Sequence, residues 1–383
     1  MAPLTDLLSC SIIEKDSNGD ILWTWSYPIV SESQKAVVAR KCNLEVEHNS
    51  PQVFVFSRYK YNWFYIHCSE VFDSDKLPKE CNENILKFCL KQVKQFALVL
   101  FAKDFNPRKY EVLSRVLSKM YCKTGKPTEI LQLYLSVFTK GSCSTQENGT
   151  FVSDDFNSHC FIISTNVREM IKTFELETIL IYTALLLKKR IIVYHHSLEQ
   201  LLKWIGIFPL LMKHRKVTDN LFPWIDLIDD ELAELKGLSH YIAGCRNSSI
   251  SSRTDLFDLL VNIPAREITV ASHAKESLTM TKTHKEIALF MIQLSENQSY
   301  IESQIISEIN DKTQDLLNQL KSLAIVQGPD GKKMVSAQTL KEKNLPPAVE
   351  HFLINLAVAE NLLLLNLAKF HGRLYGVKLT VHV

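Results

Sequence analysis

Short apolar runs separated by turn residues mark the first hundred positions of the chain. The runs at 11–13 and 21–25 flank Asn18-Gly19, a pair that tolerates positive φ, so this pattern predicts a β-hairpin. Residues 31–41 suit a short helix. The aromatic-rich runs 53–56 and 63–66 predict a second hairpin.

Residues 69–94 break this pattern and indicate an inserted loop plus helix, and the apolar run 96–101 predicts a buried strand. Asn106-Pro107 then supplies a capping side chain and a proline, the signature of a helix start. A further helix is expected from Pro127 to about residue 139. Two strands, a helix, three strands and two helices is the order of a longin-type module, an antiparallel sheet with helices against it. Such modules recur in proteins of membrane trafficking.

The pattern changes after residue 140. The polar stretch 140–158 carries turn residues and is expected to be a linker. An apolar helix at 176–187, a β-branched strand at 190–194, a helix opened by the capping box Ser197–Gln200, and strands at 241–245 and 256–263 follow. Strands that alternate with helices at this spacing predict a mostly parallel sheet flanked by helices.

From about residue 275 the chain is expected to be helical almost to its end. One long amphipathic helix is predicted around 284–324 and a last one over 352–370. The first of these either packs on the preceding module or offers a coiled-coil-like partner surface. We therefore expect an α/β protein of two lobes, with a longin-like module at 1–140, a linker at 141–158, a central α/β module at 159–270 and a helical part at 271–383.

Composition narrows the function classes. Among 383 residues, 44 are basic and 42 acidic, so the chain lacks the basic field that nucleic acid requires. The nine cysteines form no Cys-x-x-Cys pair, which favours reduced thiols in the cytosol. The N-terminus shows no export signal, and the helix at 352–370 contains Asn355, Glu360 and Asn366, which are costly in lipid. We expect a cytoplasmic protein that reaches membranes only peripherally, through partners.

No constellation of reactive groups stands out. The loop Lys123–Thr128 lacks the first glycine of a phosphate loop. The neighbours His195 and His196 end a strand, so we expect them to point to opposite faces and not to chelate one metal side by side. His159-Cys160 lacks an orienting third group, and Asp154-Asp155 lies in a polar stretch. The aromatic cluster at 54–65 is either a base-stacking platform or, more simply, one core face and one outer face. We expect no catalytic, metal or cofactor site.

The middle of the chain resembles the DENN domain. Over residues 177–245, an apolar helix leads to the strand Lys188–Val193, then to a Ser-initiated helix and to Phe-Pro pairs at 208–209 and 222–223. The strand Tyr241-Ile242-Ala243-Gly244 completes the likeness. The family usually has prolines just before this tyrosine, where this chain has Ser239 and His240.

The resemblance implies a guanine-nucleotide exchange factor for a Rab GTPase, without covalent chemistry or a cofactor, acting on membranes of the endosomal pathway, late endosomes included. The GTPase would lie across the groove between the longin-like and central modules. Arguments from exposure alone suggest Arg58, Tyr59, Lys60, Asp229 and Asp230 as partner-binding residues. The alternative is a non-catalytic docking subunit of an endosomal sorting scaffold, with coiled-coil subunits as partners.

Overall fold

The fold begins with an antiparallel sheet of five strands in the order β2-β1-β5-β4-β3. A computed structural model describes residues 3–42, 44, 53–71, 90, 92–145, 148–156, 167–323, 326–327 and 333–364. The elements of this N-terminal lobe are β1 (Leu7–Asp16), β2 (Ile21–Tyr27), α1 (Glu32–Cys42), β3 (Phe54–Tyr59), β4 (Asn62–Glu70), β5 (Val93–Ala102), α2 (Pro107–Thr124) and α3 (Pro127–Lys140). The predicted element order of the longin-like part is therefore confirmed.

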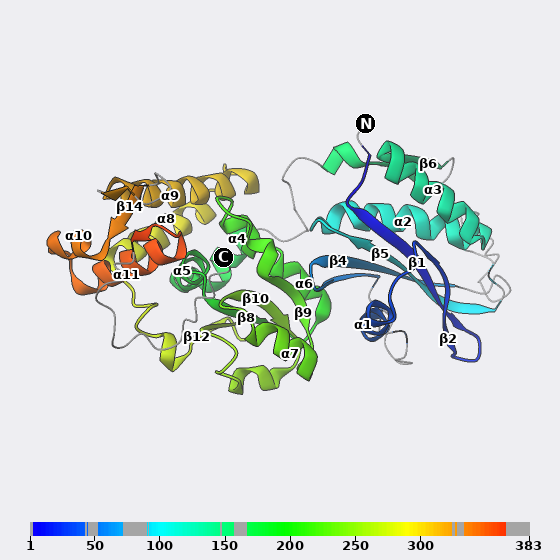
Figure 1. Ribbon diagram of the computed structural model, residues 1–383, viewed down its shortest axis with the longest axis horizontal. Helices are drawn as coiled ribbons and strands as arrows, with labels where there is room; N and C mark the ends of the chain where they lie inside the picture. Colours follow the sequence, from blue (N-terminus) through cyan, green and yellow to red (C-terminus); the bar gives the residue numbers. More distant parts are fainter. Residues whose placement is uncertain are drawn as a thin grey trace.

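Helices cover both faces of this sheet, with α1 on one side and α2 and α3 on the other (Figure 1). The central strands β1 and β5 are consequently buried over most of their length. The Asn106 side chain accepts a hydrogen bond from the Lys109 N–H (3.1 Å), and Gly125 ends α2 at φ 63°. These are the helix-start and helix-end signals that the sequence contains.

Much of the segment expected as a linker folds against the N-terminal lobe. It forms the hairpin of β6 (Ser142–Thr145) and β7 (Gly149–Val152), followed by the short helix η2 (Ser153–Phe156). Phe151 and Cys143 of this hairpin are buried, and the hairpin packs against α2 and α3. These two apolar side chains and the hydrogen bond from the Ser136 hydroxyl to the Ser142 carbonyl (2.8 Å) anchor a segment whose composition is otherwise polar.

The second lobe is built on another sheet of five strands, in the order β12-β11-β8-β10-β9. Strands β11, β8, β10 and β9 are parallel, and only β12 at the edge is antiparallel, which confirms the predicted sheet. Its strands are β8 (Arg190–Tyr194), β9 (Leu221–Ile225), β10 (Tyr241–Cys245), β11 (Leu259–Asn262) and β12 (Glu267–Val270). The helices around them are α4 (Val167–Phe174), η3 (Glu175–Glu177), α5 (Thr178–Leu186), α6 (Leu198–Ile205), η4 (Phe208–Leu211), η5 (Val217–Asn220), α7 (Asp229–Lys236), η6 (Ser248–Ser252) and η7 (Ser272–Ala274).

The single helix predicted around 284–324 is wrong, because the structure has two, α8 (Lys282–Glu296) and α9 (Glu302–Ser322). The Asn297 side chain accepts hydrogen bonds from the backbone N–H and the hydroxyl of Ser299 (3.0 and 2.7 Å). This local turn diverts the chain after α8, and Ile301 is extended.

The last helix also differs from the prediction. Helix α11 (Pro347–Ala359) starts earlier and ends well before residue 370, because Asn361 adopts φ 53° and the chain continues into β15 (Leu363–Leu364). This strand joins β13 (Val326–Gln327) and β14 (Lys333–Ser336) in a small sheet beside α10 (Ala337–Glu342). A leucine-rich run fits a strand or a helix equally well, and pairing with β14 decides between them.

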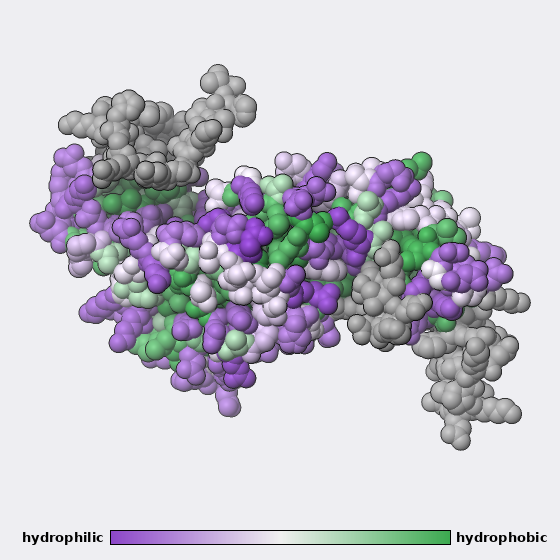
Figure 2. Space-filling model, turned by 90° about the horizontal axis from the view of Figure 1, so that it is seen from below, coloured by the Kyte–Doolittle hydropathy of each residue, from purple (hydrophilic) through white to green (hydrophobic). Residues whose placement is uncertain are grey.

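Some predictions fall on other parts of the chain. Most of the expected insertion at 69–94, the His159-Cys160 pair and the region after residue 364 lie outside the described residues. The domain boundaries remain predictions. None of the helices within the described ranges has both the length and the apolar character needed to cross a membrane. On the face shown in Figure 2, hydrophobic patches lie among hydrophilic side chains on both lobes.

Candidate functional site at the seam between the lobes

The two large sheets approach each other at their edges, where β3 of the N-terminal lobe lies beside β9 of the second lobe. The hydroxyl of Ser57 on β3 donates a hydrogen bond to the carbonyl oxygen of Trp224 on β9 (3.2 Å). Pro223, which has no N–H, precedes Trp224 on this edge strand. The seam therefore consists of side-chain contacts between two sheets and not of one continuous ladder.

A buried lysine fastens helix α1 to the second lobe. Lys41 is 2% exposed, and its ammonium donates to the Trp224 carbonyl (3.2 Å) and pairs with Asp226 (2.7 Å) and Glu231 (3.2 Å). The ammonium also lies 4.3 Å from the centre of the Trp224 ring. Arg40 adds a longer ion pair to Glu231 (3.7 Å). A buried charge with this many partners fixes how the two lobes sit against each other.

Beside Lys41 the seam opens into a pocket of about 240 Å³ whose walls come from both lobes. The N-terminal lobe contributes α1 and β3, and the second lobe contributes β9 and α7. The groups that can recognise a partner are two guanidinium groups, three aromatic side chains and three carboxylates; they belong to Arg40, Arg58, Tyr59, Phe222, Trp224, Asp230, Glu231 and Glu234. Such a mixture of rings and charges is typical of protein recognition surfaces.

Arg58 is the central cation of this pocket. Its guanidinium lies 5.1 Å from the centre of the Phe222 ring and donates to the carbonyl oxygens of Lys60 and Asp219. Burial lowers the pKa of Arg58, although the charges of Glu234 and Asp219 act in the opposite direction. Half-buried and held by these contacts, Arg58 is oriented before any partner arrives.

The structure brings together three of the five residues suggested from exposure. Arg58 and Tyr59 come from β3 and Asp230 from α7, and all three line the pocket. Lys60 lies at the hairpin tip, with its ammonium 5.4 Å from the centre of the Tyr59 ring, and Asp229 is the first residue of α7. These two residues flank the pocket. Whether any of the five contacts a partner remains a prediction.

Other residues of the seam went unrecognised in the sequence. Lys41 appears there as one of two basic residues in the last turn of a short helix, and the sequence separates it from Trp224 by 183 positions. One feature stands out in the sequence near Trp224: this large aromatic residue directly follows Pro223, a residue that is rare inside strands. Neither feature indicates that the two residues meet.

The site offers recognition groups and not an evident centre for covalent chemistry. Within the described ranges, no three His, Cys, Asp or Glu side chains converge as metal ligands. The expectation that His195 and His196 point apart is wrong: β8 ends at Tyr194, and the two rings stack with their centres 4.5 Å apart. The nearby thiols of Cys42 and Cys68 are buried, and burial raises the pKa of both. The arrangement can hold a partner through stacking, ion pairs and hydrogen bonds.

The chain is similar to known proteins over most of its length. Residues 164–272 match the family model described as "SPA: Stabilization of polarity axis". DENN domain-containing protein 10 from Danio rerio is 40% identical over 357 residues, which are 93% of this chain and 98% of that protein. The Homo sapiens protein of that name is 38% identical, over 93% of this chain and 96% of its own length. The Dictyostelium discoideum protein of that name is 34% identical, over 92% and 97%.

These relatives span both lobes and the seam between them, so the likeness extends well beyond the segment 177–245 that suggested it. Identity of 34–40% over nearly the full length of each protein is ample evidence of common descent. The chain therefore belongs to the DENN domain family, alongside the proteins named DENN domain-containing protein 10.

Proposed function

We propose that this protein is a guanine-nucleotide exchange factor for a Rab GTPase in endosomal trafficking. DENN family proteins are generally regulators of GTPases. The observation that carries the proposal is the seam pocket, because its walls come from both lobes and present Arg58, Tyr59 and Asp230 together. A GTPase seated there would contact both lobes at once.

The mechanism is differential binding. A factor that binds the nucleotide-free GTPase more tightly than the nucleotide-bound form lowers the affinity of the GTPase for nucleotide by the same ratio. The seam suits this task because Lys41 and its partners fix the two halves of the docking surface relative to each other. Because the two halves of this surface are already fixed, little of the binding free energy is lost in ordering them. More of it is available to stabilise the distorted, nucleotide-free GTPase.

The test is release of fluorescent GDP from a panel of purified Rab proteins. We expect this protein to accelerate release from at least one of them. Tyr59→Ala and Asp230→Ala should each lower that acceleration about tenfold, the effect of losing one central interface contact of roughly 1.4 kcal/mol. Matched controls are Arg108→Ala on α2 and Asp315→Ala on α9, both exposed and outside the seam pocket.

Two results would count against the proposal. If no Rab in the complete panel loses GDP faster, the protein is not an exchange factor for this class. If the two seam variants retain wild-type rates while melting at the wild-type temperature, the seam is not the docking surface.

A second function, docking in an endosomal sorting scaffold, is favoured by an aromatic patch away from the seam. The rings of Tyr27 and Tyr134 lie 5.8 Å apart, and Phe138 stacks on Tyr134 at 6.2 Å. Tyr27 and Phe138 are 41% and 37% exposed, and nearby Ile29 is 89% exposed. Exposed apolar clusters of this kind mark protein contacts. The partners we propose are coiled-coil subunits, which would also bring the protein to the endosomal surface, late endosomes included.

The docking function is separable from exchange. Phe138→Ser should weaken co-purification with such subunits and leave GDP release unchanged, since α3 lies outside the seam pocket. Stoichiometric co-purification without any acceleration of GDP release would favour docking alone.

A further inference from the structure

A second pocket, of about 310 Å³, lies at the amino-terminal ends of β8 and β10 and is rich in cations. The turn after α5 provides Lys188 and Lys189, and the segment leading into η5 provides Arg215 and Lys216. Asp219 is the only carboxylate among the described lining residues. His240 adds an imidazole, and burial together with the charges of Lys188 and Arg215 lowers its pKa to about 4, so the ring is neutral at pH 7.

Two of the four cations already have partners in the fold. Arg215 donates to the carbonyl oxygens of Leu185 and Leu186 at the end of α5 and pairs with Glu360 (2.5 Å). Lys216 pairs with Asp219 (2.9 Å), but both side chains of this pair are well exposed, so the pair is weak and can open. Arg215 is thus a rigid part of the wall, and Lys216 is available.

Lys188 and Lys189 have no such partners. Neither ammonium group forms a hydrogen bond or an ion pair with any residue that the structure describes. The carbonyl oxygens at the end of α5 do not need these lysines as donors. Arg215 donates hydrogen bonds to the carbonyls of Leu185 and Leu186, and the Lys189 backbone N–H donates to that of Ala184 (2.9 Å). Burial lowers the pKa of both lysines, and the carboxylates of Glu360 and Asp258, which act on Lys188 and Lys189 respectively without pairing with them, offset this only in part.

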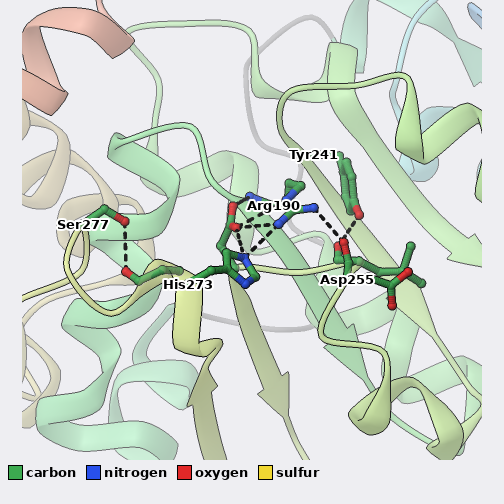
Figure 3. A network of polar contacts seen from close by, with 8 residues as sticks. Arg190, Tyr241, Asp255, His273 and Ser277 are labelled. Atoms are coloured by element: carbon green, nitrogen blue, oxygen red, sulfur yellow. Dashed lines mark hydrogen bonds and ion pairs between the residues drawn. The ribbon is translucent and has the colours of Figure 1, made fainter. Parts of the chain in front are cut away.

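The two carboxylates that act on these lysines are held by other groups: Glu360 pairs with Arg215, and the half-buried Asp258 with Arg190. Asp258 accepts hydrogen bonds from the Arg190 guanidinium (2.8 Å) and from His273 (2.9 Å), a network shown in Figure 3. Arg190 also donates to the carbonyl oxygen of Asp255 (2.8 Å), so its guanidinium is held by this network (Figure 3). The ammonium groups of Lys188 and Lys189, which form no ion pair with any described carboxylate, are therefore available to a ligand.

We propose that this second pocket binds a small phosphate-bearing anion, held by Lys188, Lys189 and Lys216 against the fixed guanidinium of Arg215. Phosphate fits because lysine acts as a mobile point charge for phosphate oxygens and arginine as a fixed fork. The volume is at the lower end for ligand pockets, which favours a compact, highly charged group over a large apolar one. The group belongs either to a soluble phosphorylated molecule or to a phosphoinositide headgroup. The proposal does not depend on exchange activity.

Calorimetric titration with inorganic pyrophosphate tests the pocket. We expect saturable binding to the wild type and binding at least about tenfold weaker to the double variant Lys188→Gln/Lys189→Gln, which loses two charge-assisted contacts. The matched control is Lys119→Gln/Lys285→Gln, which removes the same charge from exposed positions on α2 and α8 and should bind as the wild type does. Equal binding by both double variants, or no binding by the wild type, overturns the proposal.

A second measurement uses only the wild type, so its result does not depend on whether the double variant folds. Pyrophosphate should protect Lys188 and Lys189, but not Lys119 or Lys285, from acetylation read by mass spectrometry; uniform protection or none at all contradicts the site. Sedimentation with phosphatidylcholine vesicles that contain a phosphatidylinositol phosphate, but not with plain ones, assigns the lipid source. Pyrophosphate binding without sedimentation assigns the soluble source.

Discussion

The ammonium of Lys41 lies 4.3 Å from the centre of the Trp224 ring, so a cation from α1 packs on an aromatic side chain of β9. The same ammonium donates to the Trp224 carbonyl and pairs with Asp226 and Glu231. One side chain of the N-terminal lobe thus satisfies four groups of the second lobe. The docking surface proposed for the GTPase depends on this attachment.

Replacing Lys41 by Met should loosen the seam. The carboxylate of Glu231 would lose its buried counter-ion, and we expect the free energy of unfolding to fall by about 2 kcal/mol, below the usual range for a fully buried pair because Asp226 is partly solvated. Urea denaturation measures this loss. Lys35→Met, which breaks an exposed pair with Glu32, should change stability by less than about 0.5 kcal/mol. Equal losses in the two variants would show that Lys41 does not hold the lobes together.

Gly244 should not tolerate a methyl group. A Cβ at this position on β10 would collide with the carbonyl oxygen of Pro223 on β9 and lie 3.1 Å from the Leu201 side chain. Since backbone cannot move aside cheaply, we expect Gly244→Ala to cost about 3 kcal/mol or more. Gly237→Ala, whose Cβ would meet its nearest atom at an ordinary 3.4 Å, is the control and should be neutral or slightly stabilising. Thermal melts compare them, and wild-type stability of Gly244→Ala would contradict the close approach.

Acid should destabilise the protein partly through His284. Nδ1 of this buried ring accepts the Thr281 backbone N–H (3.1 Å), and burial lowers the pKa from 6.5 to about 4. Between pH 6.5 and 4, His284 is therefore protonated in the unfolded chain but neutral in the folded one. The free energy of unfolding falls over this range as the pH drops, by at most about 1.4 kcal/mol per pH unit.

His284→Gln isolates this contribution, because glutamine at the same position preserves the capping box with Thr281 and does not titrate. Between pH 6.5 and 4 the variant should lose less stability than the wild type, measured by urea denaturation at each pH. A comparison at higher pH, where both side chains are neutral, separates the lost ring contact with Phe352 from the titration. Parallel pH curves would rule His284 out.

Asp258 should stabilise the second lobe through the network in Figure 3. Burial alone would raise its pKa, but hydrogen bonds from the Arg190 side chain and backbone and from His273 lower it below 3.8. Its stabilising effect is therefore present above pH 3.8 and is lost as the pH falls through the lower folded value. Asp258→Asn should cost about 2 kcal/mol at neutral pH, and the gap from the wild type should narrow in acid.

The matched control for that prediction is Asp255→Asn, which removes a carboxylate from a more exposed pair with Arg253. Its effect should stay below about 0.5 kcal/mol. Chemical denaturation of both variants at two pH values tests the difference. A loss at Asp258 that does not change with pH would contradict the assigned linkage.

Much of the fold follows from local signals. Asn106-Pro107, Ser197 and Asn18-Gly19 each act within a few residues, so the helices and the hairpin that they start were predictable. The errors arose where local signals conflict. The turn at Asn297 interrupts an otherwise helical pattern, and the leucines after Asn361 join β14 because a partner strand is available. Where two local structures are equally compatible with the sequence, contacts with residues far along the chain decide which one forms.

The candidate site divides in the same way. Exposure arguments suggested Arg58, Tyr59 and Asp230, which line one pocket, but they gave no reason for the two segments to meet. The sequence by itself determined the family, the two kinds of sheet and the order of the elements, because alternation, caps and turns are short-range. Only the tertiary structure decided that Lys41 is buried against Trp224 and that Lys188 and Lys189 line a pocket without a direct ion pair to any described residue. Burial and charge compensation depend on residues far apart in the chain, and folding alone brings those residues into contact.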